Sequence, residues 1–154
     1  LQTCIVPVLS YNYAAADIGR CKKTLSVSLV WGMALMFIGT LCFELVPAQM
    51  LSVFTSDPQV IEIGAYGFHW IGIGFIPMVT SLIFPVFFQA IGSALKSSLL
   101  TIVRTVVLFV PLGYIFSRFG LHMFWLTFPV TETLTTLLGC FFYKKFLDQY
   151  RVRF

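Results

Sequence analysis

The chain has 154 residues, of which 58% are hydrophobic and only 10% are charged, and its formal net charge is +4. Soluble domains carry about 25% charged residues, so this composition excludes an ordinary soluble domain and predicts an all-α, polytopic helical membrane protein. The sequence has no zinc-protease, nucleophile-elbow or phosphate-loop motif. The four cysteines form no Cys-x-x-Cys pair and no metal-ligand spacing. We therefore expect no enzyme, no cofactor and no metal site.

The first segment, residues 1–12, is apolar and begins with Leu1 rather than Met. We expect it to be the end of a membrane span whose beginning lies in a longer protein. A polar segment follows and ends in three basic residues, Arg20, Lys22 and Lys23. The next stretch, residues 24–43, carries no charge and has about the 20 residues that a helix needs to cross a bilayer. It is predicted to be the first complete span.

The longest uncharged stretch runs from Ile63 to Leu95 and is predicted to contain a span over residues 64–92. Asp57 and Pro58 precede it. This pair is typical of a helix start, because an aspartate side chain can accept hydrogen bonds from the first free N–H groups and proline suits the first helical position.

Two prolines, Pro77 and Pro85, lie inside this long span. In water they would argue against a single helix. In a helix bundle, neighbouring helices can satisfy the backbone groups that a proline frees. We therefore expect one bent helix packed inside the protein.

Two further spans are predicted over residues 97–117 and 121–143. Lys96 is the only charged residue between the long span and the next one, so that turn is short. The last span contains one acidic residue, Glu132, and residues 144–154 form a short basic tail.

The basic residues divide unevenly if the four complete spans alternate in direction. One side receives Arg20, Lys22, Lys23, Lys96, Lys144, Lys145, Arg151 and Arg153, whereas the other receives Arg118. Loops rich in Lys and Arg stay in the cytoplasm. We therefore predict a multi-pass protein of the cell (plasma or inner) membrane with a cytoplasmic C-terminus. The basic residues are accounted for as membrane anchors, so no nucleic-acid partner is expected.

Four segments in order carry a family resemblance: PVLSYNYAAAD, FTSDPQVIEIGAYGF, FFQAIGSALKSSLLTIVRTVVLFVPLGYIF and FGLHMFWLTFPVTE. With their spacing they resemble the C-terminal part of a bacterial multidrug and toxic compound extrusion (MATE) transporter. The resemblance covers essentially the whole chain. One departure is Ala14, where glycine is expected in a SYNYGA-like turn.

The resemblance implies a protein of twelve spans in two lobes of six. Residues 1–12 would then end the eighth span, and the complete spans would be the ninth to twelfth. Members of this family expel cationic, amphipathic compounds against an inward gradient of H⁺ or Na⁺. The first lobe and the seventh span would be missing partners of this chain, and without them we expect it to be inactive.

Glu132 is the sharpest candidate for a cation or substrate site, and Arg104 is a weaker one. A charge near the middle of a span costs roughly 2.5–3.5 kcal/mol on insertion scales, so Glu132 is expected to face a cavity or a partner. At 1.5 Å per residue, Arg104 lies about 12 Å and Glu132 about 18 Å from the cytoplasmic face. These depths allow an ion pair. Glu132 is thus either a proton or cation site or a packing residue, and Arg104 either pairs with it or extends towards the headgroups.

Four further residues are weaker candidates. His69 is either a proton relay or, beside Trp70, an interfacial anchor. Gln89 either packs between helices or lines a vestibule. Pro77 and Pro85 either mark a gate, since interrupted helices control access in transporters, or form a static kink.

Two other functions stay open. A lipid-linked saccharide flippase of the same superfamily would need positive charge in its cavity to hold phosphates, and only Arg104 offers this inside a span. A small membrane scaffold or assembly subunit is the second alternative.

Overall fold

The computed structural model describes residues 2–151, with side chains described from residue 4 to residue 150. The described chain is all-α. Its elements in order are α1 (Gln2–Ala14), α2 (Ile18–Leu45), α3 (Pro47–Ser52), α4 (Pro58–Ala90), α5 (Ala94–Ile102), the π-helix η1 (Val103–Phe109), α6 (Val110–Ser117), α7 (Leu121–Phe124) and α8 (Thr127–Arg151). Residues 152–154 of the predicted basic tail, including Arg153, lie outside the described residues, as does Leu1.

Within residues 2–151, three helical segments are long and apolar enough to cross a membrane: Ile18–Leu45, Pro58–Ala90 and Ala94–Ser117, the last being α5, η1 and α6 in continuous succession. The segment predicted as a fourth complete span contains α7 and most of α8. Helix α8 has 25 residues, so its length would suffice. Its threonines, Glu132 and charged end make it less apolar than the other three, and its mean hydropathy is too low for it to count with them as a membrane span.

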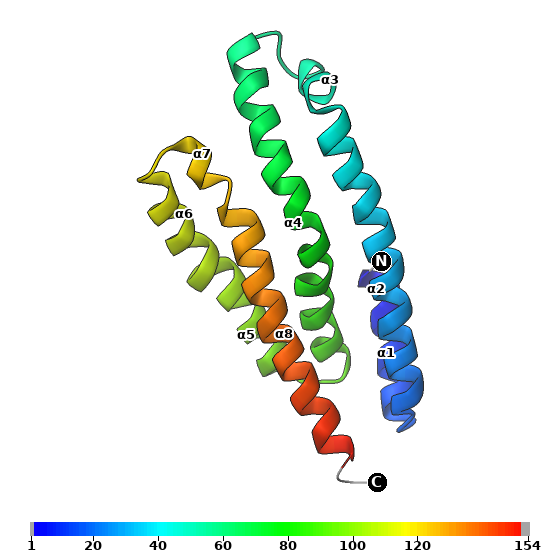
Figure 1. Ribbon diagram of the computed structural model, residues 1–154. Helices are drawn as coiled ribbons and strands as arrows, with labels where there is room; N and C mark the ends of the chain where they lie inside the picture. Colours follow the sequence, from blue (N-terminus) through cyan, green and yellow to red (C-terminus); the bar gives the residue numbers. More distant parts are fainter. Residues whose placement is uncertain (1, 152–154) are drawn as a thin grey trace.

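The long helix α4 forms the centre of the bundle (Figure 1). It packs against α8 on one side and α2 on the other, and α1, α3 and α5 also contact it. Its start agrees with the sequence prediction, because the Asp57 side chain accepts a hydrogen bond from the Gln59 N–H at 2.9 Å and Pro58 opens the helix. The structure thus confirms one continuous helix through Pro77 and Pro85.

Helices α4 and α8 approach closely where one of them carries a glycine. The Gly74 position faces the backbone of Pro129, so that a Cβ atom there would lie 3.4 Å from the Pro129 nitrogen. Lower in the bundle, a Cβ atom on Gly139 would come within 2.3 Å of the Phe84 ring. Small residues at such points let the helix backbones approach closely, as in many membrane bundles.

The turn between α1 and α2 has its positive φ angle two residues after Ala14. Ala14, where the resemblance expects glycine, is the last residue of α1, and the positive φ of 55° falls at Ala16. Asp17 then caps α2 by accepting a hydrogen bond from the Arg20 N–H at 2.8 Å. Residues other than glycine adopt positive φ only occasionally, so this turn carries some backbone strain.

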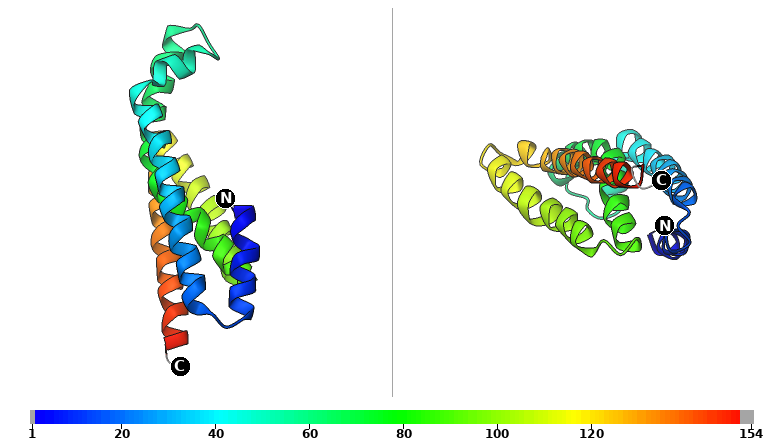
Figure 2. Two further views of the ribbon diagram at one scale, coloured as in Figure 1. Left: turned by 90° about the vertical axis from the view of Figure 1, so that its right-hand side faces the viewer. Right: turned by 90° about the horizontal axis from the view of Figure 1, so that it is seen from below.

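An aromatic core fills the end of the bundle near the chain's C-terminus. Phe87 and Phe88 of α4 are 1% and 0% exposed. The Phe87 ring lies 5.3 Å from the rings of Tyr143 and Phe146 on α8. Helix α1 runs beside the same end (Figure 2) and is joined to α4 by a hydrogen bond from the Ser10 hydroxyl to the Ala90 carbonyl at 2.8 Å.

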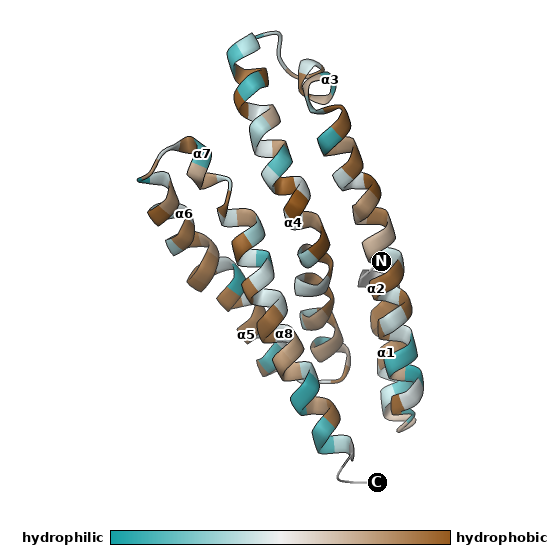
Figure 3. Ribbon diagram, viewed as in Figure 1, coloured by the Kyte–Doolittle hydropathy of each residue, from teal (hydrophilic) through white to brown (hydrophobic). Residues whose placement is uncertain are grey.

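This end also gathers basic residues from three separate helices. Lys22 of α2 and Lys144 of α8 line one cavity there, and Lys96 of α5 and Lys145 of α8 line another. Figure 3 shows hydrophilic residues at the lower ends of α2 and α8. Arg118 lies beyond α6, at the opposite end. The charge asymmetry predicted along the sequence is therefore present in space.

Candidate functional site

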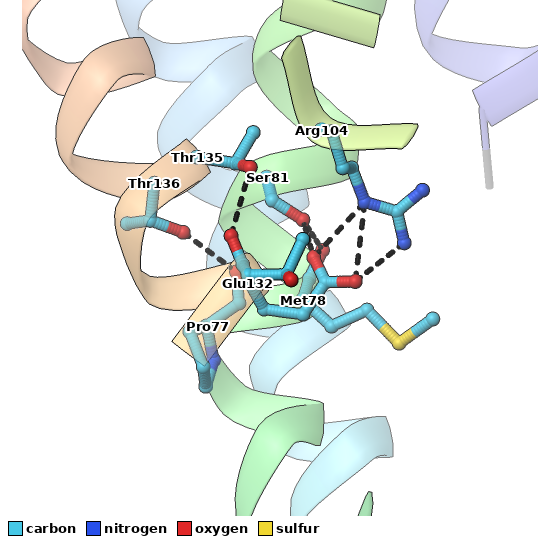
Figure 4. A network of polar contacts seen from close by, with 8 residues as sticks. Pro77, Met78, Ser81, Arg104, Glu132, Thr135 and Thr136 are labelled. Atoms are coloured by element: carbon cyan, nitrogen blue, oxygen red, sulfur yellow. Dashed lines mark hydrogen bonds and ion pairs between the residues drawn. The ribbon is translucent and has the colours of Figure 1, made fainter. Parts of the chain in front are cut away.

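Three helical segments bring a buried ion pair together in the interior of the bundle. The Arg104 Nη2 atom lies 2.5 Å from the Glu132 Oε1 atom, and Arg104 Nε donates to both carboxylate oxygens at 3.1 Å. The Ser81 hydroxyl of α4 donates to Glu132 Oε2 (Figure 4). The side chains of Arg104 and Glu132 are 24% and 9% exposed. The ion pair that the predicted depths allowed is thus present.

Arg104 lies on the π-helix η1 rather than on a regular α-helix. Pro111, at the start of α6, has no N–H to donate to the carbonyl of Val107, one turn earlier. Loss of that hydrogen bond favours the wider winding. Single π-turns inside helices are frequent at functional sites, and this one carries the arginine that reaches across to α8.

Glu132 lies on the polar face of α8 that is turned towards α4. Thr127, Thr131 and Thr135, spaced by four residues, are 0%, 1% and 1% exposed. Thr135 donates to the Thr131 carbonyl at 2.8 Å, and Thr136 donates to the Pro77 carbonyl of α4 at 2.8 Å. Among the described residues, the hydroxyls of Thr127 and Thr131 have no hydrogen-bond partner.

A cavity of about 250 Å³ lies against the ion pair. It is lined by Met78, Arg104, Thr105, Phe109, Phe128, Thr131 and Glu132. Its aromatic wall is held by an edge-to-face contact between the rings of Phe109 and Phe128, whose centroids are 5.3 Å apart. The cavity therefore offers one neutralised charge pair and two threonines, one of them Thr131 with an unpaired hydroxyl, beside an apolar wall.

The structure does not bring His69 into this site. Its Nδ1 atom lies 2.7 Å from the Glu44 Oε2 atom, and the two side chains are 50% and 34% exposed. His69 precedes Ser81 by twelve residues on α4, which places it about 18 Å further along the helix axis. The neighbouring Trp70 ring contacts the His69 ring edge-to-face at 5.6 Å.

Gln89 lies near the other end of α4, eight residues or about 12 Å beyond Ser81. Its side chain is exposed, and it lines a separate cavity of about 390 Å³ with residues of α5 that include Ser97, Ser98 and Thr101. Pro77 is at the level of the ion pair, whereas Pro85 lies lower, where its neighbours Phe84 and Phe87 belong to the aromatic core.

Sequence reasoning missed several members of the site. The four-residue spacing of the α8 threonines was a signal for one buried polar face, and Thr131 directly precedes Glu132. Ser81 lies one turn after Pro77 but offers no distinguishing pattern. The π-helix has no sequence signature apart from Pro111, and the partnership of Glu44 with His69 depends on how α2 and α4 pack.

Comparison with known proteins gives a family match and structural similarity. A protein-family model described as MatE matches residues 1–115. A solved structure described as the inward-facing conformation of a multidrug resistance MATE family transporter of the MOP superfamily matches with a TM-score of 0.80 and 17% sequence identity. The match covers 97% of this chain and 36% of that one. At this identity the likeness shows the fold alone. No curated protein matches the chain.

Proposed function

This chain belongs to the MatE family of membrane transporters, and we propose that it acts as the C-terminal part of a secondary multidrug exporter. The family match confirms the resemblance found in the sequence, and membership of a transporter family agrees with the expectation that the chain is not an enzyme. The chain spans 36% of the transporter that it resembles in structure. The activity proposed here is therefore that of a complete transporter.

The observation that carries this proposal is the buried carboxylate of Glu132. Residue Glu132 as a whole is 6% exposed in the interior of an apolar bundle. A charge at such a depth costs several kcal/mol, a cost that its ion pair offsets. Its neighbours Arg104 and Ser81 come from two other helical segments. A protonation or cation-binding event at Glu132 would therefore change contacts among α4, η1 and α8 together, as coupling between ion and substrate transport requires.

We further propose that α8 crosses the membrane as the fourth complete span, despite its lower hydropathy. Of the polar residues that lower it, Glu132, Thr127, Thr131 and Thr135 are buried inside the bundle, and only Thr133 among the α8 threonines is exposed. In the proposed twelve-span protein these helices are the ninth to twelfth spans, and residues 1–12 end the eighth. The gathering of Lys22, Lys96 and Lys144 at one end supports a cytoplasmic location for that end and for the C-terminus.

The proposed substrates are cationic, amphipathic organic compounds, exchanged for H⁺ or Na⁺. Aromatic faces such as those of Phe109 and Phe128 can contribute cation–π contacts to such compounds. Pro77 is proposed as a hinge of α4, because it lies level with the ion pair. His69 and Gln89 lie on α4 on opposite sides of the ion pair, towards the two ends of the helix. They are proposed as secondary polar sites at the two entrances to the transport pathway.

The structure weakens the case for a lipid-linked saccharide flippase. Such a protein needs free positive charge to hold phosphates, and among the lysines and arginines of the described residues only Arg104 lies within a predicted span. Its charge is already neutralised by Glu132. A small scaffold subunit would have no evident need for this buried pair.

The proposal is tested by dye efflux from cells that express the complete transporter. Wild-type protein should lower intracellular dye, and Glu132→Gln should impair this while leaving membrane insertion intact. Glu62→Gln is the matched control, because Glu62 is an exposed carboxylate near the start of α4. Normal efflux by Glu132→Gln, with normal dependence on pH and Na⁺, would refute the role of Glu132. Absence of efflux by the wild type would refute the transporter function itself.

A further inference from the structure

A groove between α1 and α2 shares no lining residue with the cavity beside the ion pair. The two helices lie side by side (Figure 1), and the groove has a volume of about 710 Å³. It joins apolar side chains of both helices to two basic residues at one end, Arg20 and Lys23. We propose that this groove binds one anionic phospholipid, with the phosphate at Arg20 and Lys23 and an acyl chain along the apolar walls. The proposal names a lipid partner and does not depend on what the transporter exports.

Each wall of the groove is one face of a helix. On α2 the lining residues recur at intervals of three or four, so that they share one face, and they include Arg20, Lys23, Val27 and Trp31. Val27 and Trp31 are 48% and 67% exposed, and Val8 on α1 is 46% exposed. Exposure of such apolar surface to water is unfavourable, so the wall matches a hydrocarbon chain.

The polar side chains deeper in the groove are bonded within their own helices. The Asn12 amide donates to the Val8 carbonyl at 2.8 Å, and the Ser28 hydroxyl donates to the Thr24 carbonyl at 2.8 Å. Asn12 and Ser28 are each 8% exposed. Because these donors are already used, the polar contacts to an occupant fall to the two basic residues.

The length of the groove matches one leaflet of a bilayer. Trp31 follows Arg20 by eleven residues, which is about 16 Å along the helix axis. Half of the hydrocarbon core of a bilayer is about 15 Å thick. The basic end of the groove is the end proposed above to be cytoplasmic. A phosphate at Arg20 and Lys23 would therefore lie at the membrane surface, and its acyl chain would extend past Val27 towards the bilayer centre.

The charge of the groove favours an anionic headgroup. No acidic residue lines it among the described residues, whereas Asp148 lines both of the cavities described above at the same end of the bundle. Arg20 is partly engaged, because its Nε atom lies 3.4 Å from the Asp17 Oδ2 atom. Lys23 is exposed and forms no ion pair within the described part of the chain. Lys23 should therefore contribute most to the phosphate contact.

Trp31 lines the groove and can report its occupant. The test titrates the complete transporter in detergent with phosphatidylglycerol or phosphatidylcholine brominated on the acyl chains, since bromine quenches tryptophan fluorescence on contact. The signal of Trp31 is the difference between the wild type and Trp31→Phe. Each basic residue near a membrane surface strengthens binding of anionic lipid by about fivefold. With Arg20 partly engaged, we expect phosphatidylglycerol to bind on the order of tenfold more tightly than phosphatidylcholine.

Two adjacent lysines of α2 provide a matched pair of variants. Lys23→Gln should reduce the preference for phosphatidylglycerol on the order of fivefold. Lys22→Gln is the control and should keep the preference, because Lys22 is equally an exposed lysine but lines a different cavity. An excess of glycerol phosphate should not relieve the quenching, because it has the phosphate without an acyl chain.

Four results would overturn the proposal. Equal binding of the two lipids, or an equal effect of the two lysine variants, would refute the phosphate contact. Absence of quenching of Trp31 by either lipid would mean that another segment of the complete protein covers the groove. Relief of quenching by glycerol phosphate would assign the basic end to a soluble phosphate instead of a lipid. The measurement requires no transport, so its failure leaves the proposed exporter standing, and a failure of dye efflux leaves the lipid site standing.

Discussion

The ion pair predicts an asymmetric loss of stability when each partner is removed in turn. Removing one member of a fully buried pair costs about 3–5 kcal/mol, because the other charge is left unpaired. Arg104→Gln leaves the Glu132 side chain without its ionic partner and only 9% exposed. Since the Arg104 side chain is itself 24% exposed, we expect a loss near the lower limit, about 3 kcal/mol.

Glu132→Gln is expected to cost less. Its single amide oxygen can still accept from Arg104, and its NH₂ group can donate to the Ser81 hydroxyl oxygen, so what it loses is mainly the charge assistance of hydrogen bonds worth about 1.5–3 kcal/mol each. The arginine left behind is the more exposed partner and can turn towards solvent or headgroups. We expect a loss of about 2 kcal/mol. In the double variant two amides can pair, so the combined loss should fall short of the sum by about 0.5–3 kcal/mol.

The assay is the unfolding midpoint of the complete transporter in detergent, measured for the wild type, both single variants and the double variant. Differences in midpoint convert to free energies of unfolding if the slope is unchanged. Additive losses would refute direct pairing between Arg104 and Glu132. A larger loss for Glu132→Gln than for Arg104→Gln would refute the reasoning from burial, even if the pair exists.

Two further predictions concern helix packing and the bend of α4. Gly139→Ala should destabilise the protein by about 1–3 kcal/mol through overpacking, because its Cβ would lie 2.3 Å from the Phe84 ring. The control Gly113→Ala should be neutral or slightly stabilising, since its Cβ would lie 3.5 Å from Phe124. Equal unfolding midpoints for the two variants would contradict the close approach of α4 and α8. Pro77→Ala should raise the activation free energy of dye turnover by on the order of 0.5–2 kcal/mol and so slow transport, while substrate affinity stays constant. Pro85→Ala, within the aromatic core, should change turnover less. Unchanged turnover in Pro77→Ala would identify a static kink.

The sequence by itself determined the class of protein and much of its layout. Charged residues are too costly in a bilayer to occur freely within spans, so a long uncharged stretch such as Ile63–Leu95 indicates a membrane-spanning helix. Asp57 and Pro58 located the start of α4 because capping is a local interaction. The basic residues near Lys22, Lys96 and Lys144 were predicted to lie at the same end of the bundle. This follows because they are separated by spans that alternate in direction.

Only the tertiary structure decided which polar residues meet. Depth along a helix follows from counting residues, and so the sequence allowed Arg104 and Glu132 to pair. The rotation of each helix about its axis does not follow from counting, because it depends on contacts such as Gly74 against Pro129 and on the π-helix that carries Arg104. That rotation brought Ser81 to Glu132 and joined His69 to Glu44. A buried polar site is built by side chains from several helices, and its members are therefore fixed by packing rather than by any local pattern.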